Sequence, residues 1–413
     1  MKRTIFFLLL TCAFGIMPTR SQDYFVNLET APVQRFLSEV TYSRTSVSQV
    51  ENYIDSSPYR LDQPNPLRLP LPWGMSKGLT VSFADNEDFA DAKEYVVESG
   101  ETEVIIYNLL PQHTYYYKIE DAFANIVSQG KVQTRGRVRM IYGPSIYNVR
   151  DMGGWETENG LRVKYGKLYR GSELNRANVA SYEDVRMLLD IGIEAELDLR
   201  KFSERAQVSD GQYSALGFSL DDNTYLGTDD FGCYSYHLIS SKYIKGYKAA
   251  IDYAVENLKA GRPVYVHCIY GADRSGLFAF FINGLLGVCY DHLAKDYELS
   301  SMSDKVTLHV KTRNFDSIVN YMNRFPGDAL KDRIEYYLMN RVGISRENID
   351  YLRSELLEDP NHGGNNSGIV TGMASAPATE HSHDAAVSYS LSGRRQQVKH
   401  GIKIAGGRKY LVR

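Results

Sequence analysis

One stretch of the sequence limits the fold more than any other: residues 264–287, VYVHCIYGADRSGLFAFFINGLLG. Its first four residues, VYVH, predict a strand, and the apolar run that follows Arg274 predicts a helix. Only a short loop separates the two, and Cys268 is its first residue. A strand that passes through a short loop into a helix is typical of α/β folds, which bind ligands at the carboxyl ends of their strands. The stretch therefore predicts an α/β domain with a ligand site around Cys268.

The region around this stretch repeats the same alternation. Residues 194–200 (EAELDLR) predict another strand, and residues 240–261 predict a long amphipathic helix that is closed by Gly261. Helical periodicity recurs at 177–192, 291–301, 315–325, 328–340 and 346–359. We therefore expect residues 139–358 to form an α/β domain with a central, partly parallel sheet flanked by helices.

The N-terminal part follows a different pattern. Short segments of strand character, separated by Asp, Asn, Gly and Pro, occur at 79–83, 94–97, 103–110, 114–119 and 130–134. Residues 22–138 therefore predict a separate all-β sandwich. In residues 109–115, LLPQHTY, the spacing of Leu, Pro and Tyr resembles fibronectin type III domains, in which such a tyrosine hydrogen-bonds back across a corner. An unrelated all-β module is the alternative.

The N-terminus has the pattern of a secretory signal. A positively charged start precedes an apolar run at residues 5–16, and Thr19 and Ser21 have the spacing that a signal peptidase reads. Residues 1–21 therefore predict a signal peptide and an exported protein, located in the periplasm, at the cell surface or outside the cell. The alternatives are a membrane anchor, for which the run is short, and a lipoprotein attached at Cys12. No later stretch predicts a transmembrane segment after cleavage.

The C-terminal residues are polar and then basic. Residues 359–386 predict a linker, and the linker histidines His362, His381 and His383 lack the framework of a metal site. Residues 387–413 resemble the C-terminal sorting segments of Bacteroidetes proteins that use type IX secretion; a solvated basic tail is the alternative. The formal net charge of −3 gives no reason to expect a nucleic-acid partner.

Three cysteines remain after the predicted cleavage, and only Cys268 has an arginine six positions later, Arg274. A loop that closes onto a helix N-terminus directs backbone N–H groups toward one point, where they bind a tetrahedral dianion and stabilise a thiolate. Gly271 permits a backbone conformation that is closed to other residues. Cys268 is thus the candidate nucleophile and Arg274 the candidate ligand of phosphate oxygens. Ser275 is expected to hydrogen-bond the departing sulfur, and His267 to orient the loop.

Four stretches of the chain resemble one family. HCIYGADRSG, residues 267–276, resembles the active-site loop of cysteine-dependent protein tyrosine phosphatases, H-C-x5-R-S/T-G, and in particular the bacterial tyrosine/serine subgroup with HCxxGKDRTG. NVRDMGG at 148–154, YRGSEL at 169–174, and LDLR at 197–200 with Glu204 are similar to further motifs of that subgroup. The resemblance implies a cysteine phosphatase that needs no metal or other cofactor.

The resemblance also implies which residues bind phosphate. They are the residues of the loop: Ile269, Tyr270, Gly271, Ala272, Asp273 and Arg274. Ala272 stands where the subgroup has lysine, and the loss of that cation weakens the inference to phosphoinositides. Tyr270 is expected to narrow the pocket or to stack on an aromatic leaving group.

The general acid is open at the level of sequence, because geometry defines it. Asp273 lies within the loop and is favoured slightly; its other role would be to bind loop amides. Asp230 comes next, in a loop upstream of Cys268 where related phosphatases carry a mobile acid. The same loop holds Asp229, Asp221 and Asp222. Arg150 and Asp151 are expected to tie the start of the domain under the loop.

Taken together, the residues predict an exported phosphatase. Its substrate would be a phosphorylated protein, with phosphotyrosine first and phosphoserine or phosphothreonine next, and its intermediate a phosphocysteine. One alternative is a phosphatase of inositol phosphates or other small phosphomonoesters. The other is a non-catalytic surface protein whose β-domain binds a partner that the sequence does not identify.

Overall fold

The computed structural model of the chain describes residues 20–39, 50–54, 60–72, 78–312 and 314–360, and the backbone of 374–375, 401–405 and 408–412. The chain divides into two compact units. The first comprises Met1–Tyr24, Leu69–Val104 and Thr114–Gln133, and the second comprises Phe25–Arg68, Ile105–His113 and Thr134–Arg413. Most of the predicted signal peptide, linker and C-terminal segment lies outside the described residues, so these assignments and the predicted domain boundaries stay predictions.

The N-terminal strands form a mainly antiparallel sheet in the order β1-β8-β7-β4-β5, with β2 also paired to β8. Its members are β1 (Arg20–Ser21), β2 (Tyr24–Asn27), β4 (Thr80–Ala84), β5 (Lys93–Val96), β7 (Thr114–Glu120) and β8 (Ile126–Arg135). Strand β7 buries Tyr115, Tyr117 and Ile119 on one face, as the period of two in TYYYKIE predicts. A second sheet joins β3 (Leu67–Pro70), β6 (Glu103–Tyr107) and β16 (Ala374–Ser375). All five predicted strands are confirmed, whereas the fibronectin type III likeness stays a prediction.

The α/β unit is built on a five-stranded sheet in the order β13-β12-β14-β11-β9. Its members are β9 (Arg150–Asp151), β11 (Leu168–Gly171), β12 (Ala195–Asp198), β13 (Tyr225–Gly227) and β14 (Val264–His267). Strands β11, β12, β13 and β14 are parallel, and β9 pairs antiparallel to β11 at the edge. The expected partly parallel sheet is confirmed, and β14 lies at its centre. The carboxyl end of β14 therefore meets those of β11 and β12.

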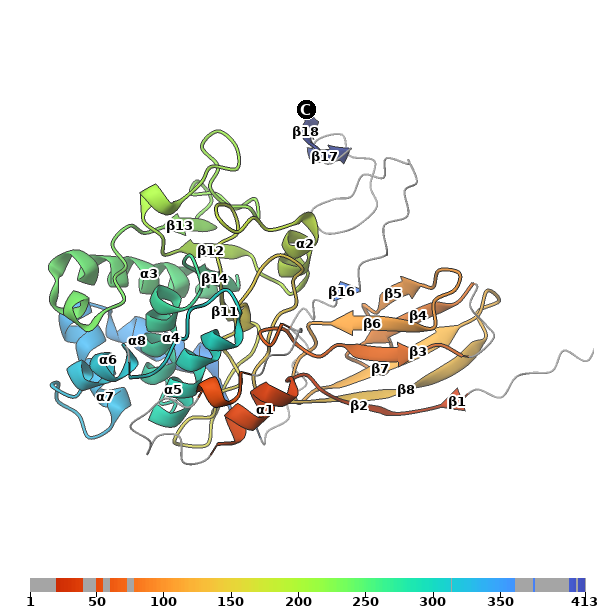
Figure 1. Ribbon diagram of the computed structural model, residues 1–413, viewed down its shortest axis with the longest axis horizontal. Helices are drawn as coiled ribbons and strands as arrows, with labels where there is room; N and C mark the ends of the chain where they lie inside the picture. Colours follow the sequence, from red (N-terminus) through yellow and green to blue (C-terminus); the bar gives the residue numbers. More distant parts are fainter. Residues whose placement is uncertain are drawn as a thin grey trace, which may run out of the picture. The chain divides into compact units, whose positions relative to one another are not determined.

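Helices cover both faces of this sheet (Figure 1). Along β14, Val264 and Val266 belong to one apolar core, and Tyr265 belongs to the other. Leu188 of α2 (Tyr182–Asp190) lies in the core of Tyr265, and Ile251 of α3 (Ser241–Lys259) lies in the core of the two valines. The alternation of side chains along a strand thus places a helical layer on each face.

Helix α4 (Asp273–Leu285) is buried on every side from Ser275 to Leu285. Its sequence is apolar all round, which is the pattern of a helix in the interior of a domain. The remaining elements are α1 (Ala31–Ser38), η2 (Val50–Asn52), η3 (Phe202–Glu204), η4 (Ser235–Ile239), α5 (Tyr290–Leu299), η5 (Ser300–Met302), α6 (Phe315–Met322), α7 (Leu330–Tyr337), η6 (Leu338–Val342) and α8 (Arg346–Leu356). Each helix predicted from the sequence is present, while α1 had no prediction.

Two further pairs of short antiparallel strands lie outside these sheets. β10 (Arg162–Val163) pairs with β15 (Leu357–Glu358), and β17 (Gly401–Ala405) pairs with β18 (Arg408–Val412). Among the helices of the described residues, none combines the length and the apolar character that a membrane crossing requires.

The packing of α4 generates a stability prediction. Phe281 is fully buried and its ring contacts those of Tyr247 and Tyr337, with centroids 5.4 and 5.8 Å away. Phe281→Ala removes these contacts and leaves a cavity, so we expect the free energy of unfolding to fall by about 3–5 kcal/mol. Urea denaturation followed by circular dichroism measures the change. Phe123→Ala is the control, since Phe123 is 86% exposed; equal effects of the two substitutions would contradict the predicted packing.

Candidate active site

The loop from Cys268 to Ala272 connects β14 to α4 in the way that the sequence predicts. Cys268 directly follows the last residue of β14 and is only 3% exposed. Gly271 has φ +67°, a conformation that side chains disfavour. A Cβ atom there would lie 2.4 Å from the carbonyl carbon of Gly171, at the end of β11. Glycine is therefore required for both its conformation and its size, and the loop lies tightly against β11.

Four successive carbonyl groups of the loop are bound by other parts of the unit. The Ile269 carbonyl accepts from the backbone N–H of Glu173 (3.0 Å), and the Tyr270 carbonyl accepts from Asn148 Nδ2 (2.9 Å). The carbonyls of Gly271 and Ala272 both accept from Arg170 Nη2, at 2.9 and 3.0 Å.

These contacts orient the loop amides. In a trans peptide the C=O and the following N–H point in opposite directions, and the chain contains no cis peptide among its described residues. The N–H groups of residues 270–273 therefore point away from the groups that bind the carbonyls. Consecutive N–H groups that face one side, next to a helix N-terminus, form a binding site for a tetrahedral anion.

A buried carboxylate holds the arginine that binds the loop. Asp296 of α5 accepts from Arg170 Nη1 at 2.6 Å and from Arg150 Nε at 3.0 Å. Burial raises the pKa of Asp296, but Arg150 and Arg170 lower it by more, so its pKa lies below the ordinary value. Arg150 Nη1 in turn donates to Asn148 Oδ1 at 2.5 Å. The predicted tie between Arg150 and the loop thus runs through Asn148 and Asp296.

Asp151 has a different role from its neighbour Arg150. Its carboxylate accepts from the backbone N–H groups of Gly153 (2.9 Å) and Gly166 (2.7 Å) and pairs with the buried Arg139. Burial raises the pKa of Asp151 above its ordinary value despite these partners. Asp151 therefore shapes the turn that follows β9, and its side-chain partners in the described part of the chain are Gly153, Gly166 and Arg139.

Arg274 is tethered at the start of α4 by a single nitrogen. Its Nη1 donates to Glu204 Oε2 at 2.6 Å and to the carbonyl of Leu199 at 3.0 Å. Burial lowers the pKa of Arg274, but Cys268 and Glu204 raise it by more, so the pKa lies above its ordinary value. Within the described residues, Nε and Nη2 of Arg274 make no hydrogen bond. This edge of the guanidinium group can therefore bind oxygens of an anion. Glu204 thereby has a role that its motif alone did not specify.

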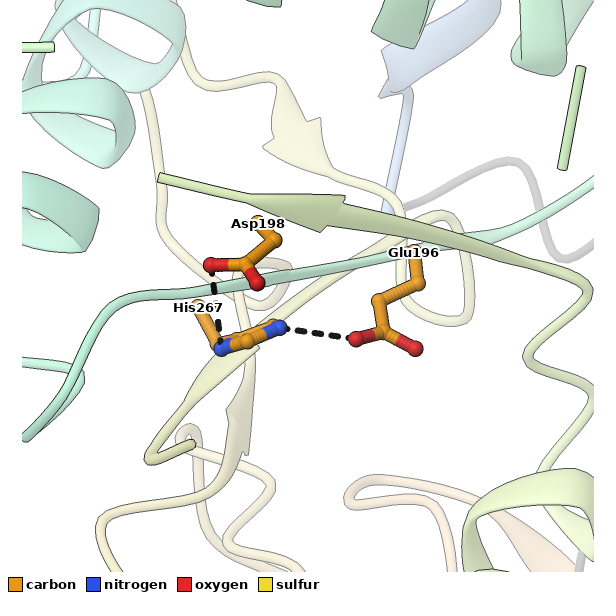
Figure 2. Close-up of side chains that lie close together, drawn as sticks. All are labelled: Glu196, Asp198 and His267. Carbon is orange, nitrogen blue, oxygen red and sulfur yellow. Dashed lines mark hydrogen bonds and ion pairs between the residues drawn. The ribbon is translucent and has the colours of Figure 1, made fainter. Parts of the chain in front are cut away.

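His267 belongs to a buried cluster with two carboxylates (Figure 2). Its Nε2 lies 2.9 Å from Glu196 Oε1, and its Nδ1 lies 3.3 Å from the Cys268 carbonyl and 4.0 Å from Asp198 Oδ1. Asp198 also binds Arg200 through both carboxylate oxygens. These three side chains are of types that bind metal ions, and their ligand atoms all lie within 4.8 Å of one another. However, both carboxylates already accept hydrogen bonds from protein donors, which favours a role in positioning the loop.

The candidate acids occupy different surroundings. Asp273 is the first residue of α4, its side chain is 43% exposed, and its Oδ1 lies 3.0 Å from Nε2 of His309. Asp230 forms an ion pair with Lys242 at 3.3 Å, and its side chain is 40% exposed. Asp273 directly follows the loop in the sequence and therefore lies next to it. Asp230, in contrast, forms its ion pair with an exposed lysine.

The other loop acids have partners away from the loop. Asp229 pairs with Arg205 at 2.8 Å. The Thr224 hydroxyl, and to a lesser extent the Thr224 backbone N–H at 3.1 Å, hydrogen-bond Asp222 and keep its pKa below the ordinary value. Asp221 is exposed.

Two further side chains lie near the loop: Ser275, for which the sequence predicts a role, and Cys233, for which it predicts none. The Ser275 hydroxyl is buried and has no hydrogen-bond partner within the described residues, so it can serve a group that binds in the loop. Cys233 lies near the same place: burial, then Asp273 and Cys268, raise the pKa of its thiol to about 12. Cys233 is therefore a neutral thiol, and nothing in its sequence surroundings indicated its proximity to Cys268.

Comparisons with known proteins agree with this geometry. Residues 142–358 match the model of the tyrosine phosphatase family. The chain is 28% identical over 170 residues to a protein of Cupriavidus necator that is named as a tyrosine-protein phosphatase, covering 37% of this chain and 60% of that protein. It is 26% identical over 276 residues to the triple specificity protein phosphatase PtpB of Mycobacterium tuberculosis, covering 52% of this chain and 98% of that protein.

The tight fit of Gly271 predicts a loss of anion binding on substitution. Gly271→Ala places a Cβ against Gly171 and forces the loop to move, so we expect the affinity for tungstate, a tetrahedral dianion, to fall about 100-fold. Isothermal titration calorimetry measures it. Gly160→Ala is the control, because Gly160 has a similar φ of +78° but open space around it. Equal affinities in the two variants would contradict the amide site.

The Asp198 carboxylate predicts a loss of stability in acid. Burial raises its pKa, but His267 and Arg200 lower it by more, to about 2 from 3.8. Between about pH 4 and pH 2 the unfolded chain therefore binds more protons than the folded chain. As the pH is lowered through this window, the free energy of unfolding decreases by about 2 kcal/mol. Urea titrations across the window check this against Asp198→Asn. The expected result is a weaker pH dependence in the variant; identical slopes would argue against the ion cluster.

Proposed function

Because the chain belongs to the tyrosine phosphatase family, we propose that it hydrolyses phosphomonoesters through a phosphocysteine formed on Cys268. The observation that carries the proposal is the orientation of the loop. Four of its carbonyls are bound by Glu173, Asn148 and Arg170, which leaves the amides of residues 270–273 to receive the phosphoryl oxygens. Arg274 adds a charged donor at the start of α4.

In the first step the Cys268 thiolate attacks phosphorus in line with the leaving oxygen. The S–P bond forms, the P–O ester bond breaks, and an aspartic acid gives its proton to the leaving oxygen. The loop amides and Arg274 hold the three equatorial oxygens, on which charge is spread in the transition state. We assign the proton to Asp273, because it lies at the loop and its side chain is partly exposed.

In the second step water replaces the sulfur. The O–P bond forms, the S–P bond breaks, and the carboxylate that gave its proton takes one from the water. The Ser275 hydroxyl, which is buried without a partner in the described structure, donates a hydrogen bond to the sulfur as negative charge returns to it. No metal ion takes part in this sequence of steps.

The substrate class rests on the family and on one substitution in the loop. Phosphotyrosine is the first choice, and phosphoserine or phosphothreonine the next; the mycobacterial relative is named as a protein phosphatase, which favours a phosphorylated protein as the substrate. Ala272 carries no cation, so the site offers less charge to an inositol phosphate with several phosphates. A panel of these substrates, compared by kcat/KM, ranks the classes.

The location and the N-terminal region belong to the proposal as well. The signal-like residues 1–21 support export to the periplasm, the cell surface or the medium. The pattern of residues 109–115 supports a fibronectin type III-like sandwich with a binding role. A non-catalytic binding protein is the second reading of the whole chain, but the retention of Cys268, Arg274 and Ser275 together favours catalysis.

Substitution of the nucleophile tests the function. Cys268→Ser should lower the hydrolysis of p-nitrophenyl phosphate by more than about 1000-fold, because an un-ionised hydroxyl replaces the thiolate. The assay contains EDTA and a reducing agent. Cys289→Ser is the matched control, since Cys289 lies at the start of α5 and should keep full activity. A folded wild type without activity, or activity that survives in Cys268→Ser, would refute the proposal.

A further inference from the structure

His309 lies between η5 and α6 and is 3% exposed. Ser301 binds its backbone at two points: the Ser301 hydroxyl accepts from the His309 N–H at 2.6 Å and donates to the His309 carbonyl at 3.1 Å. The ring lies against that of Tyr297, with centroids 3.6 Å apart. A histidine held in this way has a fixed position and a fixed ring orientation.

The two ring nitrogens of His309 have different partners. Nδ1 lies 2.8 Å from the backbone carbonyl of Tyr297, and Nε2 lies 3.0 Å from Oδ1 of Asp273. A carbonyl oxygen only accepts hydrogen bonds, so Nδ1 carries a proton. The contact between Nε2 and Oδ1 then needs a further proton. Either the ring is an imidazolium that donates to Asp273, or Asp273 is protonated and donates to the ring.

We propose that His309 is a positioning residue that holds Asp273 in place as the proton donor of the reaction, by donating from Nε2 to Oδ1. The proposal rests on the function proposed above. It adds a residue that lies 36 positions from Asp273 in the sequence and outside every motif that identified the loop.

At the start of the two proposed steps, Asp273 carries the transferable proton and its Oδ1 accepts from the His309 imidazolium. When the proton passes to the leaving oxygen, the new carboxylate remains bound to the imidazolium, and such charge-assisted hydrogen bonds are strong. When water attacks the phosphocysteine, its proton returns to the carboxylate. His309 ends each cycle with the protons it had at the beginning.

Three neighbours of Asp273 among the described residues, Cys233, Tyr297 and Tyr234, are uncharged near neutral pH. Burial and then Asp273 raise the pKa of Cys233 and of Tyr297. Cys233 and then Asp273 raise the pKa of Tyr234. Arg274 follows Asp273 in α4 and stays charged, with Glu204 as its counter-ion.

A series of aryl phosphates separates this role from a general structural one. Phenyl phosphate has a poor leaving group that needs a proton, whereas 2,4-dinitrophenyl phosphate has a good one that does not. We expect His309→Leu to lower kcat/KM about 10- to 100-fold for phenyl phosphate and less than about 3-fold for the dinitrophenyl ester. His309→Gln keeps an N–H donor at the same place and should recover most of the loss. In an Asp273→Asn background, His309→Leu should have little further effect.

The control is His292→Gln. His292 lies in α5 and bonds Arg137 and the Glu156 carbonyl, so it should leave the series unchanged. An equal loss for both substrates in His309→Leu and in His309→Gln, with both proteins folded by circular dichroism, would overturn the proposal. So would additive effects of the His309 and Asp273 substitutions. The comparison of the wild type with Cys268→Ser tests the proposed function separately. A wild type without Cys268-dependent hydrolysis would refute that function.

Discussion

The active-site loop depends on one buried carboxylate, that of Asp296. It neutralises Arg150 and Arg170, whose side chains are fully buried, and Arg170 then binds two loop carbonyls. Two arginines without this partner would be uncompensated charges in an apolar interior, which costs several kcal/mol. The same carboxylate binds Arg150. Arg150 in turn donates to the side chain of Asn148, which donates to the carbonyl of Tyr270. The loop is therefore shaped before any ligand arrives, and binding need not order it.

The arrangement around Cys268 separates two tasks. Glu173, Asn148 and Arg170 bind the carbonyls and so determine the shape of the loop, while the loop amides are the proposed ligand site. Arg274 shows the same separation. Glu204 binds its Nη1, while the other nitrogens of the guanidinium group can bind an anion. Such preorganised donors stabilise the charge of a transition state without reorganising during the reaction. In the role that we propose for it, His309 extends the same principle to Asp273, because it binds one carboxylate oxygen from a fixed position.

The sequence predicted the local parts of this site well. The strand at 264–267, the helix that follows Arg274 and the conformation of Gly271 all follow from short-range rules of periodicity and backbone sterics. It did not indicate Asp296, 146 positions from Arg150, or His309. An aspartate within a helical segment and a histidine in a connecting segment have no local signal, and only long-range packing brings them to the loop.

By itself the sequence determined the class of the domain, the loop that carries Cys268 and the strand and helix that hold it, because these depend on residue order over short distances. The tertiary structure decided which groups bind the loop carbonyls, which glutamate anchors Arg274 and which histidine faces Asp273. Those choices depend on contacts between elements that are far apart in the sequence, such as β11 with α5 and the loop before α4. A buried charge requires a partner in space, and the chain order does not state which residue will be that partner.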